Sequence, residues 1–182
     1  MLIFLDTEFT DFVNTSLLSI GLVSEDGREF YAESAEVDYA KCSDFTREVV
    51  VPMLGADASA ILKRDVLAER LRKWLDQFSS SDIVVFTHPL DASLLLQAVA
   101  GNPSVQMQYL SGVILGSAEY DAARNETFAG DRPQHHALTD AHAMRNGYLA
   151  YQKARQATFS YLMEDWAWDI SCGAEPAVTK GK

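Results

Sequence analysis

The chain has 182 residues, 48% of them hydrophobic, and carries a formal net charge of −11 at pH 7. This length suits one domain with a substantial core, so we expect a single domain over residues 1–172 and a disordered tail at 173–182. No segment approaches the roughly 18 apolar residues of a membrane helix, so no membrane partner is expected. The acidity argues against charge-driven coating of duplex nucleic acid, which leaves substrates that are short, single-stranded or held by an end.

The cysteines and the first residues of the chain indicate the cellular compartment of the protein. Cys42 and Cys172 are far apart in the sequence and do not have the spacing of a metal-binding cluster. Asp6 and Glu8 interrupt the first apolar run, so no secretion signal is expected. Two reduced thiols are typical of a cytoplasmic protein, which is the predicted location.

The first three predicted elements are strands. Apolar runs at residues 2–8, 17–24 and 29–33 have the composition of buried strands. Asp26 and Gly27 separate the second run from the third, and this pair favours a hairpin turn. The chain is therefore predicted to begin with three antiparallel strands.

Helices and strands alternate in the rest of the chain. Residues 59–78 place apolar side chains on one stripe and predict an amphipathic helix, and residues 83–86 predict a buried strand parallel to the first. The later predictions are a helix at 91–100, a strand at 105–110, a helix at 111–124, a mobile loop at 125–134, a helix at 138–157 and a further helix at 158–169. The predicted fold class is α/β, with a mixed sheet of three antiparallel N-terminal strands plus parallel strands, flanked by helices.

Asp6 and Glu8 stand at the end of the first predicted strand. Side chains two residues apart in a strand lie on the same face of the sheet. Two carboxylates at this spacing repel each other unless one takes up a proton or a cation lies between them. The pair therefore predicts a divalent metal site, with ordinary surface acids as the alternative.

Two further acids occur near the starts of predicted helices. Asp91 follows the strand 83–86, where open α/β sheets place ligand crevices, although it could also serve as a helix cap. Asp140 could likewise be an acid favoured by the helix dipole. If both reach Asp6, four carboxylates meet, a set that suits two Mg²⁺ or Mn²⁺ ions and phosphodiester cleavage. His135 lies on the preceding loop as a candidate general base.

Other residues near these acids are candidate substrate contacts. Phe9 and Phe12 could stack on terminal bases, since aromatic faces accept any base, or could pack in the core. Thr7 lies between Asp6 and Glu8 and is a further candidate substrate contact. Arg124 and Arg145 flank the last acidic motif and could contact phosphates, or could be solvated surface charges.

Two segments of the sequence carry a resemblance to a known family. Residues 5–9 (LDTEF) resemble the first motif of the DEDDh branch of the 3′-5′ exonucleases, which have the ribonuclease H-like fold. Residues 135–141 (HHALTDA) resemble that family's His-x-Ala-Leu-x-Asp-Ala motif. The resemblance implies that four carboxylates bind metal, namely Asp6, Glu8, Asp91 and Asp140. It also implies that His135 is the general base.

The match departs from the family just before Asp91. The family has an Asn a few residues ahead of its second-motif aspartate, whereas residues 87–90 of this chain read THPL. Within the family, the compact size and residues 19–32 are most similar to small bacterial exoribonucleases.

The resemblance implies a metal-dependent 3′-5′ exonuclease that releases nucleoside 5′-monophosphates from single-stranded 3′ ends by a two-metal-ion mechanism. It favours RNA over DNA as the substrate and, by analogy, a homodimer. A DNA-directed enzyme of the same family is one alternative. Residues 6–10 also resemble the nucleophile motif of haloacid dehalogenase-like phosphatases, with Asp6 as nucleophile, but Glu8 stands where that family has Asp. A catalytically inactive ribonuclease H-like module that binds RNA is the third alternative.

Overall fold

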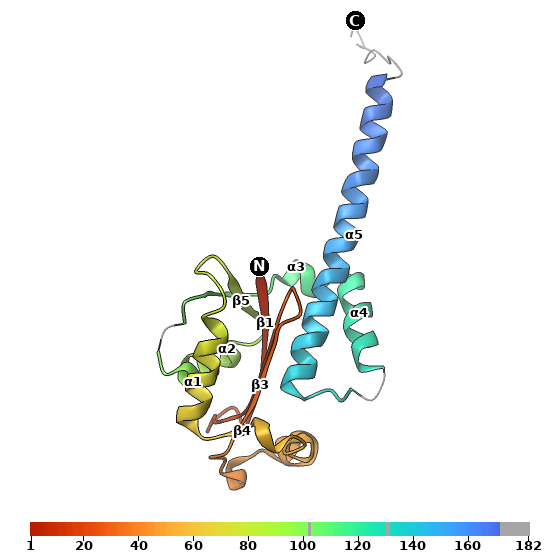
Figure 1. Cartoon of the computed structure of the whole chain (residues 1–182). Coiled ribbons are helices and arrows are strands. Elements are labelled where there is room, and N and C mark those ends of the chain that lie inside the picture. Colours follow the sequence, from red (N-terminus) through yellow and green to blue (C-terminus); the bar gives the residue numbers. More distant parts are fainter. Residues whose placement is uncertain (102, 130–131, 172–182) are drawn as a thin grey trace, which may run out of the picture.

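A six-stranded mixed sheet forms the centre of the protein in a computed structural model that describes residues 1–101, 103–129 and 132–171 (Figure 1). The strands are β1 (Leu2–Phe9), β2 (Leu17–Ser24), β3 (Glu29–Ser34), β4 (Ile61–Leu62), β5 (Ile83–Phe86) and β6 (Gln106–Tyr109). Their order across the sheet is β4-β3-β2-β1-β5-β6. The first three strands pair antiparallel, and β5 and β6 extend the sheet in parallel from β1, as the sequence predicts.

Helices cover both faces of this sheet. They are α1 (Arg64–Leu75), α2 (Pro89–Val99), α3 (Gly112–Leu115), α4 (Ala118–Phe128) and α5 (Ala137–Ser171). The short helical segments η1 (Tyr39–Lys41), η2 (Thr46–Val50), η3 (Val51–Met53) and η4 (Ala58–Ala60) lie between β3 and β4. The far part of α5 projects away from the sheet (Figure 1). Within the described ranges, none of the helices combines the length and hydrophobicity needed to cross a bilayer.

The alternation of side chains along β1 decides where the first acids point. Ile3 and Leu5 are buried in the core that α1 and α2 share with the sheet. Phe4 faces the other side, where it packs with Met144 and Tyr148 of α5. Because successive strand residues alternate between faces, Asp6 and Glu8 continue the Phe4 face and lie on the α5 side of the sheet.

Gly21 of β2 lets α5 approach the sheet beside these acids. Gly21 is the register partner of Asp6, and a Cβ atom on Gly21 would lie 2.4 Å from the backbone nitrogen of Leu138. A distance this short is not tolerated between backbone atoms and a side chain. The absence of a side chain at Gly21 therefore brings the N-terminus of α5 against the end of β1.

Replacing Gly21 by Ala is expected to lower the free energy of unfolding by about 1–3 kcal/mol, because α5 must move away from β2. Urea unfolding measures the loss. The control is Gly112→Ala, since a Cβ atom on Gly112 meets nothing within 4 Å. Equal stability of the two variants would contradict the close docking of α5 on β2.

Several predicted boundaries differ from the structure. The helix predicted at 59–78 begins only at Arg64, because Ile61 and Leu62 pair in parallel with the end of β3 and extend the sheet edge. The helix predicted at 111–124 is divided into α3 and α4, since the hydroxyl of Ser117 accepts a hydrogen bond from the backbone N–H of Tyr120 and begins a new helix.

The C-terminal half also departs from the prediction. The loop predicted at 125–134 begins only after Phe128, because α4 continues to that residue and Thr127 accepts a hydrogen bond from Asn146 of α5 at 3.0 Å. The helices predicted at 138–157 and 158–169 are one continuous helix, α5. The predicted tail at 173–182 lies outside the described residues.

Candidate active site

Three carboxylates meet at the end of β1 and the start of α5. Asp6 and Glu8 come from β1, and Asp140 comes from the first turns of α5. One ligand atom from each of the three residues lies within 4.8 Å of the others. We call these three residues the carboxylate cluster. Carboxylate oxygens in such a group are the ligands that hard divalent cations prefer.

Hydrogen bonds within the first turn of α5 hold Asp140 in place. The backbone N–H of His136 donates to Oδ2 of Asp140 at 3.1 Å, and the backbone N–H of Asp140 donates to the carbonyl oxygen of His136 at 3.0 Å. Asp140 therefore does stabilise the start of its helix. Only one of its oxygens is used in this way, so the other is available within the carboxylate cluster.

The carboxylate cluster is electrostatically strained. Burial, followed by the charges of Asp91, Asp140 and Glu8, raises the pKa of Asp6 well above its usual value. Burial and the charges of Asp140 and Asp91 raise the pKa of Glu8 to about 8. Burial also raises the pKa of Asp140. Desolvated like charges at this distance favour either protonation or a bound cation.

Asp91 lies next to the carboxylate cluster but is not one of its three members. Its charge raises the pKa of Asp6 and of Glu8, so it is near both. Its Oδ1 accepts a hydrogen bond from the Thr7 hydroxyl at 2.7 Å, and its Oδ2 accepts one from the backbone N–H of His88 at 3.2 Å. Asp91 thus takes part in capping α2, and Thr7, predicted as a substrate contact, is buried and fixes the Asp91 carboxylate.

The side chains of His135 and His136, just before α5, have different partners. His135 has a backbone φ of 64°, a left-handed conformation that is uncommon for a residue with a side chain. The His135 charge lowers the pKa of Asp140, which places its ring near that carboxylate. His136 instead stacks on Tyr31, with ring centroids 4.6 Å apart. A strained backbone beside a group of acids is typical of functional sites.

Phe45 is a contact of His135 that sequence reasoning missed. Its ring meets the His135 ring edge to face, with centroids 5.0 Å apart and an angle of 88°. Phe45 is 53% exposed, so this contact lies at the surface. No apolar periodicity could have revealed Phe45, because it directly precedes the short helical segment η2 and its partner His135 is far away in the sequence.

Three aromatic rings form a surface group at the ends of β1 and β5, which we call the aromatic cluster. Its members are Phe9, Phe12 and His88, with centroid distances of 5.2 Å for Phe9–Phe12, 5.8 Å for Phe12–His88 and 6.4 Å for Phe9–His88. Phe12 is 73% exposed, which excludes core packing for its ring. The cluster is available to stack on flat ligands.

The two predicted phosphate-binding arginines lie in different places. Arg124 lines a pocket of about 270 Å³ together with Asp6 and Asp140, and its charge lowers the pKa of both acids. Arg145 donates from Nε to the carbonyl oxygen of Ser24 at 2.9 Å and from Nη2 to that of Glu25 at 2.6 Å. Since Ser24 pairs with Ile3, Arg145 lies toward the opposite end of β1 from the carboxylate cluster.

Comparison with known proteins points to nucleases. No protein-family model matches the chain. Two proteins of Mycobacterium tuberculosis, from strains CDC 1551 / Oshkosh and ATCC 25618 / H37Rv and both named 3′-5′ exoribonuclease, are each 39% identical to this chain over 80 residues. The match covers 43% of this chain and 46% of each relative, so the chain spans about half the length of the curated relatives it matches.

Proposed function

We propose that the protein is a metal-dependent 3′-5′ exoribonuclease that releases nucleoside 5′-monophosphates from single-stranded 3′ ends. The observation that carries the proposal is the carboxylate cluster, whose three ligand atoms lie within 4.8 Å of one another. The partial similarity to two proteins named 3′-5′ exoribonuclease supports this reaction class. The six-stranded mixed sheet is compatible with a ribonuclease H-like fold.

The donor set fits divalent metal ions of the hard class. Asp6, Glu8 and Asp140 supply oxygen ligands, and Asp91 supplies a fourth negative charge beside them. The raised pKa values of Asp6, Glu8 and Asp140 express a repulsion that bound cations remove. Asp6, Glu8 and Asp140, with Asp91 beside them, would hold a pair of Mg²⁺ or Mn²⁺ ions, and the chemistry supplied there would be activation of water and stabilisation of charge on the leaving oxygen.

The remaining steps fall to side chains around the carboxylate cluster. His135 accepts the proton of the attacking water at a ring nitrogen, and Phe45 restrains the histidine ring. Arg124 faces the phosphate of the last phosphodiester bond. It lines the same pocket as Asp6 and Asp140, and its charge lowers the pKa of both acids. The rings of the aromatic cluster stack on the bases near the 3′ end without selecting a sequence.

The test is hydrolysis of matched single-stranded RNA and DNA, labelled at the 5′ end and incubated with Mg²⁺ or Mn²⁺. We expect a ladder of products shortened from the 3′ end, release of nucleoside 5′-monophosphates, and faster turnover of RNA. Products shortened from the 5′ end, or no turnover of either strand, would refute the proposal. Faster turnover of DNA would assign the DNA-directed alternative.

A further inference from the structure

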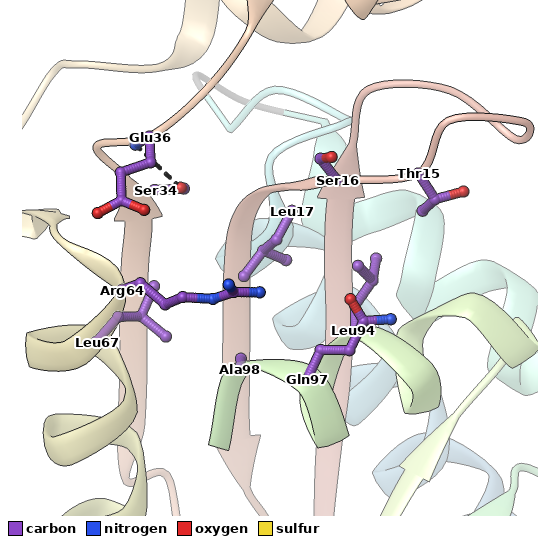
Figure 2. A pocket seen from close by; sticks show the side chains of 10 residues that line it. All are labelled: Thr15, Ser16, Leu17, Ser34, Glu36, Arg64, Leu67, Leu94, Gln97 and Ala98. Carbon is purple, nitrogen blue, oxygen red and sulfur yellow. Dashed lines mark hydrogen bonds between the residues drawn. The ribbon is translucent and has the colours of Figure 1, made fainter. Parts of the chain in front are cut away.

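A second pocket lies on the sheet face that α1 and α2 cover, opposite to the face of the carboxylate cluster (Figure 2). It has a volume of about 220 Å³. Its floor is apolar and consists of Leu17, Leu67, Leu94 and Ala98. Its polar lining includes Thr15, Ser16, Arg64 and Gln97. We call this hollow the Arg64 pocket.

Arg64 is the positive charge of this pocket. Figure 2 shows its guanidinium group extending from α1 toward Leu17 at the start of β2. Among the residues that the structure describes, no hydrogen bond or ion pair engages this guanidinium, although Glu36 lies on the rim of the same pocket. A guanidinium presents five donors, which match the oxygen atoms of a phosphate group.

Two parts of the chain connect the Arg64 pocket to the candidate active site. The first is α2, which carries Asp91 near its start and Gln97 six residues later, about 9 Å along the helix axis. The second is the loop between β1 and β2, which carries Phe12 of the aromatic cluster and then Thr15 and Ser16 of the pocket. These two connections give a path for an RNA strand from the carboxylate cluster, past the aromatic cluster, to the Arg64 pocket.

The size and lining of the pocket restrict its ligand. Pockets for complete small-molecule ligands commonly have volumes of about 300–1,000 Å³, so this one suits a single unit of a longer molecule. The apolar floor fits a flat base, and the hydroxyl groups of Thr15 and Ser16 and the amide of Gln97 can bond a ribose or a base edge. The Glu36 carboxylate repels phosphate, which directs a phosphate group to the Arg64 side of the rim.

We propose that the Arg64 pocket binds an upstream nucleotide of the single-stranded RNA whose 3′ end lies at the carboxylate cluster, with the guanidinium of Arg64 on a phosphate of that strand. This inference rests on the proposed exoribonuclease function. It adds a substrate-binding subsite on the second face of the sheet, and it predicts that strands long enough to reach the pocket bind more tightly than dinucleotides.

Binding of a 5′-fluorescein-labelled hexauridylate, measured by fluorescence anisotropy in EDTA, tests the pocket without any hydrolysis. We expect Arg64→Gln to weaken binding about tenfold, which corresponds to about 1.4 kcal/mol. Gln97 lines the same pocket from α2. Gln97→Glu adds a negative charge there, which should repel the RNA phosphates and weaken binding. Lys73→Gln removes the same charge from an exposed position farther along α1, and its effect should stay within twofold.

Hydrolysis provides the second measurement. In the wild-type protein the KM of a hexanucleotide should lie below that of a dinucleotide, and Arg64→Gln should abolish most of this difference. The subsite is refuted if Arg64→Gln and Lys73→Gln weaken hexauridylate binding equally, or if Arg64→Gln raises both KM values by the same factor. The wild-type protein could bind hexauridylate and lose this binding in Arg64→Gln, yet hydrolyse no RNA. That result would refute the proposed enzyme and leave the pocket supported.

Discussion

Asp140→Asn is expected to reduce RNA hydrolysis by roughly 10³-fold, because it removes one of the three charges that converge in the carboxylate cluster. The substitution preserves the size of the side chain and the acceptor that the backbone N–H of His136 uses. The rate of release of nucleoside 5′-monophosphates in saturating Mg²⁺ measures the effect. A rate within tenfold of the wild-type value would contradict the proposed role of the carboxylate cluster.

A matched control separates this effect from a general loss of acidity. Glu126 of α4 is exposed and makes no side-chain hydrogen bond or ion pair among the described residues, so Glu126→Gln should hydrolyse RNA at the wild-type rate. Asp140→Asn also relieves repulsion in the metal-free protein, so its thermal unfolding temperature in EDTA should not fall. A folded, stable Asp140→Asn protein without activity would exclude misfolding as the cause of the loss.

The stability of the metal-free protein should fall as the pH rises from about 4.5 to about 8. Burial and the neighbouring acids raise the pKa of Glu8 from 4.5 to about 8, so the folded protein holds this proton more tightly than the unfolded chain does. The contribution is complete below pH 4.5 and is lost as the pH passes through the folded pKa. Thermal unfolding in EDTA across this range measures the slope.

Divalent ions should reverse this loss at neutral pH. A ligand that binds only the folded protein stabilises it by about 2.7 kcal/mol at a hundredfold excess over its dissociation constant. Mg²⁺ or Mn²⁺ should therefore raise the unfolding temperature at pH 8, and Glu8→Gln should flatten the pH dependence in EDTA. If EDTA and Mg²⁺ give the same unfolding temperature, and Glu8→Gln keeps the wild-type slope, the carboxylate cluster does not bind these ions.

Local patterns in the sequence predict the parts of the fold that depend on periodicity. The two-residue period of β1 places Asp6 and Glu8 on one face, and the structure brings Asp140 to them. The mixed sheet follows from the order of the apolar runs. The short strand β4 was not predicted, because its pairing with β3 joins residues about 28 positions apart and leaves no local signal.

Contacts between side chains far apart in the sequence could not be predicted from local patterns. Arg145 was predicted to meet phosphates because it follows the last acidic motif, yet it bonds two carbonyl groups at the end of β2. Those carbonyl groups need a donor that no sequence pattern identifies. Phe45 and the Arg64 pocket were missed for a similar reason, since each brings together elements that are far apart in the sequence.

The carboxylate cluster draws its members from residues 6, 8 and 140, and this separation affects the newly synthesised chain. A ribosome delivers Asp6 and Glu8 early and Asp140 only after most of the domain has emerged. A nascent polypeptide without α5 holds two of the three converging acids, whatever else has folded. The carboxylate cluster is complete only when α5 docks at Gly21, so translation itself delays its assembly.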